Sequence, residues 1–298
     1  MSKSISILLP TYNCSCVALV TELQRQCVAE GIPFEILVAD DASPDRSFIT
    51  KNEPIKALEG VRYILREKNV GRSAIRNFLI SQAQNDWLLF IDGDLSLLNP
   101  QFIHNYVQAE GEVVVGGISI GGDPKQWKNN LRYVYEQRYE ATHNAAERQQ
   151  TSTQHFRTTN FLAHKTAMSA CPFDESFKQY GYEDVLLGKA FEAQGIKIKH
   201  IDNPITLDDF EPNNVFVAKT EESLRTLSQF KNLLQGYSHL LSFQAKMQRF
   251  HLLGLLSFSY ILLKKTIKPR LIDNKPNVFL FNIYKLLYFT HFDTKHYD

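Results

Sequence analysis

The stretch from Trp87 to Asp94 constrains the fold of this chain more than any other. It is a run of large apolar residues that ends abruptly in Asp92-Gly93-Asp94. A strand that is buried on both faces in a parallel sheet is continuously apolar, and ligands of open α/β sheets bind beyond the carboxyl ends of the strands. The stretch therefore predicts a central strand that delivers two carboxylates to a ligand-binding edge. The alternative is an ordinary acidic turn.

Two carboxylates on either side of one glycine repel each other unless a cation lies between them. Oxygen ligands suit Mg²⁺ or Mn²⁺, which can bridge carboxylates to the phosphates of a substrate. Gly93 has no Cβ, so the backbone can turn sharply there or come close to a bound group. We therefore expect a divalent cation and a diphosphate beside Asp92 and Asp94.

The residues before Trp87 alternate between strand and helix patterns. Strands are predicted at residues 5–9, 34–39 and 61–65, with helices at about 15–30 and 72–84. Such alternation implies right-handed crossovers and a mostly parallel α/β sheet whose strand ends gather at one edge. The residues expected there are Pro10, Thr11, Tyr12, Asn13, Asp40, Asp41, Asp92 and Asp94. A glycine-rich dinucleotide motif and a Walker lysine motif are both missing.

Further elements are predicted after residue 100. Val113 to Gly117 is predicted to be a buried strand that ends at two glycines, where the backbone can come close to a neighbouring group. A long polar helix is expected from Asp123 to about residue 150. Another helix begins at Glu183-Asp184, where its dipole favours ionised carboxylates by about 0.3–1 kcal/mol. An ionised carboxylate can accept a proton. The alternative is that both acids only stabilise the helix start.

The distribution of charge divides the chain into two predicted domains, residues 1–215 and 216–298. The second part has 12 Lys or Arg against 5 Asp or Glu, a balance of +7 that leaves −6 for the first part. A basic tail suits an anionic surface, and nothing in the pattern indicates nucleic acid as a partner. The four cysteines show no zinc or disulfide spacing, and the first residues resemble no signal peptide, so we expect reduced thiols and a cytoplasmic location.

The tail, predicted to be helical, contains two apolar stretches, residues 250–263 and 278–289. The first has 14 residues without a formal charge, fewer than the ~20 that a membrane-spanning helix needs. Lysines and an arginine follow it directly, which fits a peripheral segment on anionic lipid, where each cation near the surface contributes about 1 kcal/mol. The alternatives are a helical hairpin that covers the first domain and a dimer contact.

Six motifs in order resemble the inverting family-two glycosyltransferases of the GT-A fold, over roughly residues 5–215. A Rossmann-like nucleotide-binding half belongs to that fold. Each motif alone is weak, and the ordered series is specific. The motifs are Pro10-Thr11-Tyr12-Asn13, Asp40-Asp41-Ala42-Ser43, Asn69-Val70-Gly71 with Ala74-Ile75-Arg76-Asn77, Asp92-Gly93-Asp94, Asn160-Phe161 and Tyr180-Gly181-Tyr182-Glu183-Asp184.

The resemblance implies a role for each matching residue. It implies that Pro10, Thr11 and Tyr12 border the nucleotide base and that Asp41 hydrogen-bonds it, most often a uracil. By the same resemblance Arg76 lies along the diphosphate or holds the Asp-Gly-Asp loop, Asp92 contacts the ribose or its water shell, and Asp94 binds Mg²⁺ or Mn²⁺. It also implies that Asp184 is the catalytic base and that Glu183 positions the acceptor. We further expect Asn160, Tyr180 and Tyr182 to contact that acceptor; for the two tyrosines the alternative is packing in the core.

The function implied is transfer of a hexosyl or N-acetylhexosaminyl group from a nucleotide sugar, typically a UDP-sugar, to a hydroxyl of a surface glycan or glycolipid. Family members often carry a histidine after the Glu-Asp helix, but residues 203–211 contain none. Two alternatives stay open: a nucleotidyltransferase on a related sheet, and a non-catalytic partner subunit that binds a nucleotide or sugar.

Overall fold

The computed structural model describes residues 3–139, 144–273 and 275–296. These residues form two compact units. The first comprises described residues up to 121 with 144–178 and 183–209, and the second comprises residues 122–139, 179–182 and 210 onward. This division groups residues 122–139 and 179–182 with the C-terminal helices, whereas the sequence suggested a single boundary after residue 215.

A seven-stranded sheet forms the centre of the first unit, in the order β3-β2-β1-β4-β7-β5-β8. Every strand pair is parallel except those of β7, which runs antiparallel to both β4 and β5. The predicted mostly parallel sheet is therefore confirmed. The strands are β1 (Ile5–Thr11), β2 (Phe34–Asp40), β3 (Val61–Leu65), β4 (Trp87–Ile91), β5 (Val113–Val115), β7 (Asn160–His164) and β8 (Ile198–His200).

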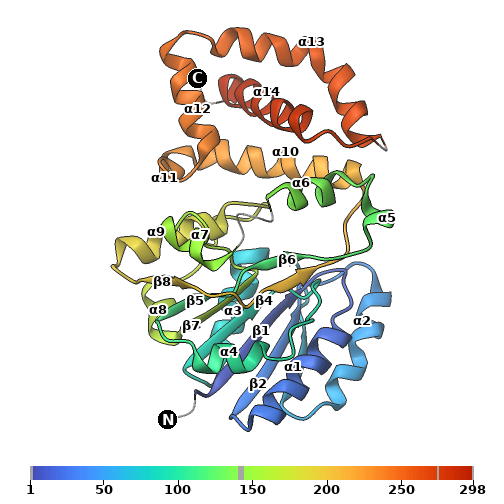
Figure 1. Cartoon of the computed structure of the whole chain (residues 1–298), viewed down its shortest axis with the longest axis vertical. Helices are drawn as coiled ribbons and strands as arrows, with labels where there is room; N and C mark the ends of the chain where they lie inside the picture. The colour runs from blue at the N-terminus through green and yellow to red at the C-terminus, as the bar shows by residue number, and fades with distance from the viewer. Residues whose placement is uncertain (1–2, 140–143, 274, 297–298) are drawn as a thin grey trace. The chain divides into compact units, whose positions relative to one another are not determined.

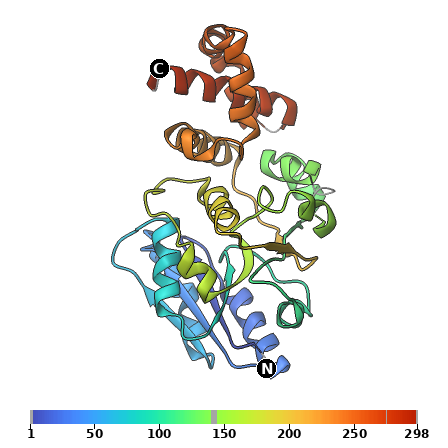
Figure 2. The same cartoon turned by 90° about the vertical axis from the view of Figure 1, so that its left-hand side faces the viewer.

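Helices cover both faces of this sheet (Figures 1 and 2). On one face α1 (Val17–Glu30) packs beside α4 (Phe102–Gln108), while α2 (Arg46–Asn52) and the short η1 (Glu53–Ala57) follow β2. On the other face the apolar side chains of α3 (Arg72–Gln82), α8 (Lys165–Ala170) and α9 (Glu183–Ala193) form one buried cluster with the sheet. At its centre the rings of Phe90 and Phe161 stack with centroids 4.4 Å apart. This packing fixes the first turns of α3 and α9 relative to the strands.

Two glycines separate β5 from the next strand, β6 (Ile118–Ile120), which pairs with β9 (Ile205–Leu207) in a second, two-stranded sheet. A Cβ at Gly116 would lie 2.5 Å from Tyr106 Oη, and one at Gly117 would lie 2.6 Å from Arg148 Nη1. Gly117 also has φ +89°, a value that side chains disfavour. The predicted strand that ends in a close approach is confirmed.

The predicted long helix from Asp123 to about residue 150 is wrong. The structure has three shorter helices, α5 (Pro124–Trp127), α6 (Leu131–Tyr139) and α7 (Ala145–Gln150), and residues 140–143 lie outside the described residues. Asn130 Oδ1 accepts from the backbone N–H of Tyr133, and Asn144 Oδ1 accepts from that of Glu147, each at 2.9 Å. These asparagines cap new helix starts, a role that asparagine favours over a helix interior.

The second unit is helical. Besides α5 and α6, its helices are α10 (Asn213–Gln229), α11 (Lys231–Leu234), α12 (His239–Arg249), α13 (Leu253–Ile272) and α14 (Val278–His296). Helix α14 packs against both α10 and α13, and Figure 1 shows it between them. Among the described residues no single helix is long and apolar enough to cross a membrane. The pair α12 and α13 meets that criterion only when taken together, and it is bent by 115°.

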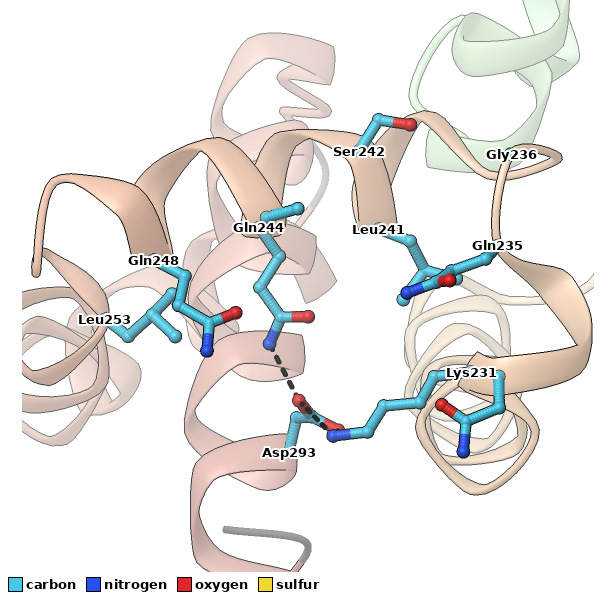
Figure 3. A pocket seen from close by; sticks show the side chains of 11 residues that line it. Lys231, Gln235, Gly236, Leu241, Ser242, Gln244, Gln248, Leu253 and Asp293 are labelled. Carbon is cyan, nitrogen blue, oxygen red and sulfur yellow. Dashed lines mark hydrogen bonds and ion pairs between the residues drawn. The ribbon is translucent and has the colours of Figure 1, made fainter.

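Asp293 joins three helices of this unit. The buried carboxylate of α14 accepts from Ser228 Oγ at 2.5 Å, from Gln244 Nε2 at 2.8 Å and from Lys231 Nζ at 3.1 Å. Figure 3 shows Lys231 and Gln244 pointing toward it across a polar cavity of about 330 Å³. Burying a carboxylate is costly unless hydrogen-bond donors satisfy it, and here three side chains do so. These contacts hold α14 against α10, α11 and α12.

Candidate active site

The carboxyl ends of β1, β2 and β4 meet at one edge of the sheet. The backbone N–H of Asp41, just after β2, donates to the carbonyl of Thr11 at the end of β1 at 3.0 Å. Gly93, just after β4, packs so tightly on the same strand end that a Cβ there would lie 2.6 Å from Thr11 Cγ2. The strand ends that were predicted to gather at one edge do so. The close approach of Gly93 is to the protein's own backbone and side chains.

The negative charge of this edge contributes to a raised pKa of the Cys14 thiol. Burial in the loop after β1 raises its pKa, and the charges of Asp94, Asp40 and Asp92 add to that rise, to about 12. Carboxylates from two different strand ends therefore act on one side chain. An edge with this concentration of negative charge attracts cations.

Arg76 on α3 connects the loop after β4 to the start of α9. Its Nη2 donates to Asp92 Oδ1 at 2.6 Å, and its Nη1 lies 3.7 Å from Glu183 Oε1. The side chain is only 2% exposed. A buried guanidinium requires anionic partners, since breaking a buried ion pair costs about 3–5 kcal/mol. One cation thus holds together two acids that lie far apart in the sequence, and of the two predicted placements for Arg76 the structure shows the one against the Asp-Gly-Asp loop.

Asp41 organises the loop that leads into α3. Its Oδ1 accepts from the backbone N–H of Val70 and its Oδ2 from that of Gly71, both at 3.0 Å. Burial raises the pKa of Asp41 above its ordinary value, and the two N–H groups offset only part of that rise. Each carboxylate oxygen has a second lone pair, so the group keeps capacity to accept a hydrogen bond from a ligand.

The remaining residues predicted on the nucleotide side differ in exposure. Tyr12 is 48% exposed and Asp94 is exposed, while Pro10 is half-buried. Thr11 is buried, and its hydroxyl donates to the carbonyl of Ala39 at 3.3 Å. Tyr12 can therefore offer a ring face to a ligand, whereas Thr11 supports the sheet edge.

The acids at this edge fit a divalent cation that arrives with another ligand. Within residues 3–139, 144–273 and 275–296, no three His, Cys, Asp or Glu side chains group closely enough to hold a metal. Asp94 presents an exposed carboxylate, and Asp92 is engaged by Arg76. Mg²⁺ is usually bound through one or two carboxylates, with waters and substrate phosphates completing the shell. This donor set fits that arrangement.

Asp184 lies in the first turn of α9, directly after Glu183. Its side chain is 21% exposed, and its Oδ2 is 3.8 Å from Arg157 Nε. Burial raises its pKa above the ordinary value of 3.8. The Arg157 guanidinium opposes this shift, and the charge of Glu183 adds to it. A carboxylate with a raised pKa that stays partly accessible is suited to taking up a proton.

Asn160 occupies a different environment from the one predicted. It is 1% exposed, its Oδ1 accepts from Tyr106 Oη at 2.6 Å, and its Nδ2 donates to the carbonyls of Gly117 and Asn203 at 2.8 and 2.9 Å. Both amide hydrogens are used within the protein. Asn160 therefore holds several backbone segments together, and its side chain is not open to an acceptor.

Tyr180 and Tyr182 belong to the second unit. The backbone N–H of Tyr180 donates to Glu222 Oε1 at 3.1 Å, and its carbonyl accepts from Thr226 Oγ1 at 3.0 Å, so α10 holds this segment. Tyr182 has φ +68°, an uncommon conformation for a side chain of this size. Both tyrosines are half-buried.

Two arginines near the acids were missed from the sequence. Arg72 Nη1 donates to Glu183 Oε1 at 3.5 Å, and Arg157 pairs with Asp184. Arg72 had a signal, because it precedes Arg76 by four residues and so shares its helix face. Arg157 lies in a loop, where no periodicity indicates a partner.

Residues 6–170 match the family described as Glycosyl transferase family 2, which is more than half of the 298 residues. The chain belongs to glycosyl transferase family 2. The matched part of this family 2 chain contains Arg76 and the Asp92-Gly93-Asp94 loop, and Glu183 and Asp184 follow it.

Curated relatives of this family 2 chain match parts of it. Poly(ribitol-phosphate) beta-glucosyltransferase of Bacillus spizizenii is 36% identical over 131 residues, 41% of this chain and 20% of that protein. Hyaluronan synthase of Pasteurella multocida is 27% identical over 233 residues, 66% of this chain and 24% of that protein. An uncharacterized glycosyltransferase of Haemophilus influenzae is 30% identical over 96 residues, 32% of this chain and 38% of that protein. The matches thus span well under half the length of each relative.

Solved structures resemble this family 2 chain over its whole length. Mannosyltransferase PcManGT from Pyrobaculum calidifontis, in complex with GDP-Man and Mn²⁺, has a TM-score of 0.59 at 15% identity and covers 100% of this chain and 89% of its own. S. aureus TarS 1-349 in complex with UDP has a TM-score of 0.52 at 16% identity, with 99% and 92% covered. At these identities the likeness concerns the fold, and the predicted GT-A fold is confirmed.

Proposed function

We propose that this chain is a metal-dependent inverting glycosyltransferase that moves a sugar from a UDP-sugar to an acceptor hydroxyl of a surface glycan or glycolipid. The observation that carries the proposal is the contact of Arg76 with both Asp92 and Glu183, at 2.6 and 3.7 Å. In a family 2 chain this contact places the loop that would receive a nucleotide sugar beside the helix start that would receive an acceptor. Glycosyl transfer needs both at one site.

On the donor side, we assign Tyr12 and Pro10 to the nucleotide base, because Tyr12 exposes a ring at the sheet edge. Asp41 would accept a hydrogen bond from that base with its remaining lone pairs. Asp92 would contact the ribose while Arg76 fixes its orientation. The solved relatives in complex with GDP-Man and with UDP share the fold, which supports a nucleoside diphosphate sugar as the class of donor.

The exposed carboxylate of Asp94 would hold Mg²⁺ or Mn²⁺ against the two phosphates. Such an ion, when bound, supplies Lewis-acid stabilisation of charge on the leaving diphosphate, worth several kcal/mol. Asp94 itself would contribute an oxygen ligand and a negative charge, just after the carboxyl end of β4. The position of Asp40 and Asp92 at the ends of the two strands that flank β1 supports this assignment, because several carboxylates at one edge attract a cation.

On the acceptor side, Asp184 would take the proton of the attacking hydroxyl, and Glu183 would position the acceptor. Glu183 is held by Arg72 and Arg76, so its orientation is fixed. Asp184 is more accessible than Glu183, 21% against 6% for the two side chains. Attack by the activated hydroxyl on the face opposite the leaving group inverts the anomeric centre, by the geometric logic of inverting glycosidases.

Product analysis tests this proposal. The full chain is incubated with Mn²⁺ and a panel of UDP- and GDP-linked hexoses and N-acetylhexosamines, and the released nucleotide is identified. We expect nucleoside diphosphate from at least one UDP-sugar, and less of it when EDTA is present. Release of pyrophosphate would identify a nucleotidyltransferase instead. Binding of UDP and Mn²⁺ by calorimetry with no turnover of any donor would identify a non-catalytic binding subunit.

The pH dependence of transfer should follow the ionisation of Asp184. A base must be deprotonated, so kcat/KM should fall as the pH falls through the pKa of this carboxyl. Because that pKa is raised, the fall should begin at a higher pH than it would for an ordinary aspartate. The variant Arg157→Gln removes a cation that lowers this pKa, so its acid limb should move to higher pH. The pH profile of kcat/KM measures this. Arg25→Gln on α1 is the matched control, and an acid limb that stays in place in Arg157→Gln would contradict the assignment.

A further inference from the structure

Helix α13 exposes a row of large apolar side chains. Leu255, Phe258 and Leu262 are 61%, 56% and 62% exposed. They are three and four residues apart, so they lie on one face of the helix. Leu252, Ile261 and Leu263 are also exposed and flank this row. We call Leu255, Phe258 and Leu262 the outward row of α13.

The opposite side of α13 is covered by the protein. Ile267 and Leu271 are buried in one cluster with Phe281 and Tyr284 of α14. Leu256 and Tyr260, in the first two thirds of the helix, pack against the same cluster, so one side of that part is covered while the outward row is exposed. A helix that is apolar all round is typically buried in a protein core or in lipid. The outward row therefore indicates an apolar partner, which the described residues do not supply.

Cations continue from the outward row toward the end of the helix. Residues 250–272 contain four Lys or Arg and no Asp or Glu. Lys268 pairs with Glu221 at 2.6 Å, and Lys264 lies over the ring of Tyr260. Lys265 and Arg270 are exposed and make no ion pair among the described residues. An apolar row followed by two cations in solvent complements a surface that is apolar inside and anionic outside.

We propose that α13 docks this chain on an anionic lipid bilayer, with the outward row among the acyl chains and Lys265 and Arg270 against the lipid phosphates. The helix lies along the surface and does not cross it, because its uncharged stretch, residues 253–263, has 11 residues and is shorter than the ~20 that spanning needs. Charge selects lipid over a second copy of the chain, since two copies of this face would bring the same cations together. The inference does not depend on the transferase activity.

Flotation of the full chain with vesicles tests this docking. We expect the protein to float with phosphatidylcholine vesicles that contain about one third phosphatidylglycerol, and to float much less with phosphatidylcholine alone or at high salt. The variant Leu255→Gln/Phe258→Gln/Leu262→Gln should lower the partition coefficient by on the order of 100-fold or more, because three apolar side chains no longer enter the bilayer. Lys265→Glu/Arg270→Glu should lower it by roughly 25-fold or more, about fivefold for each cation.

Two controls make the result specific. Lys197→Glu/Lys199→Glu changes the net charge equally at exposed positions of the first unit, and it should float like the wild type. Thermal unfolding by circular dichroism should show that the outward-row variant stays folded, because the replaced side chains are exposed. Failure of the wild type to float with anionic vesicles would overturn the proposal, as would equal flotation of the outward-row variant. A wild-type dimer that this variant dissociates, without flotation, would assign the face to a second copy instead.

Discussion

Replacing Asp184 by asparagine should lower kcat by about 10²- to 10⁴-fold, the usual contribution of a positioned general base. Asparagine has nearly the same shape and retains an oxygen that can accept the N–H of Val185, now at 2.8 Å. It cannot take up a proton from an acceptor hydroxyl. The measurement is the steady-state rate of transfer at saturating donor, and calorimetry should show unchanged binding of UDP with Mn²⁺.

The control for this variant is Glu192→Gln, which removes one negative charge from an exposed position of the same helix. Its kcat should match that of the wild type, and thermal unfolding should show that both variants are folded. An Asp184→Asn protein that transfers sugar at nearly the wild-type rate would remove Asp184 from the proposed mechanism. Loss of UDP binding in that variant would place the residue on the donor side.

Replacing Asp94 by alanine should lower kcat/KM by roughly 10²- to 10³-fold or more, because the cation would lose its protein ligand, and its stabilisation of the leaving diphosphate is worth several kcal/mol. Asp94→Ala should also weaken UDP binding in the presence of Mn²⁺ to the level that the wild type shows with EDTA. Asp184→Asn should not do this. The two variants therefore separate the donor half of the site from the acceptor half.

Asp86→Ala provides the control for Asp94→Ala. Asp86 is exposed just before the other end of β4, so the change removes the same charge from a position remote from the strand-end edge. Its affinity for UDP and Mn²⁺ should equal that of the wild type. If Asp94→Ala keeps the wild-type, metal-dependent affinity, the cation is held elsewhere and the donor half of the proposal fails.

The parts of the fold that could be predicted from sequence are those with a local cause. The strand at Val61–Leu65 was placed correctly, and the strand before Asp92 ends where the acids begin. In both cases polar or turn residues bound an apolar run, so the local sequence pattern predicts where the strand begins and ends. The acids Asp92 and Asp94 could be placed at a strand-end edge for the same reason.

The contacts that complete the candidate site could not be predicted in this way. The ion pair between Arg157 and Asp184 depends on tertiary packing, as does the burial of Asn160 between carbonyls of two distant segments. The break at Asn130 in the predicted long helix is a competition between helix propensity and capping, and the asparagine side chain favours the cap. Local residue patterns do not predict these long-range contacts or the choice between a cap and a helix interior.

Arg76 gives the molecule a mechanical property under the proposed function. Its single guanidinium touches Asp92 on one side and approaches Glu183 on the other, and it is buried so deeply that it has little room to swing. Displacement of the loop after β4 by an arriving nucleotide would move Arg76 and so disturb its ion pair with the first turn of α9. The two ion pairs of Arg76 thus couple the position of the proposed donor loop after β4 to that of the proposed acceptor side at the start of α9.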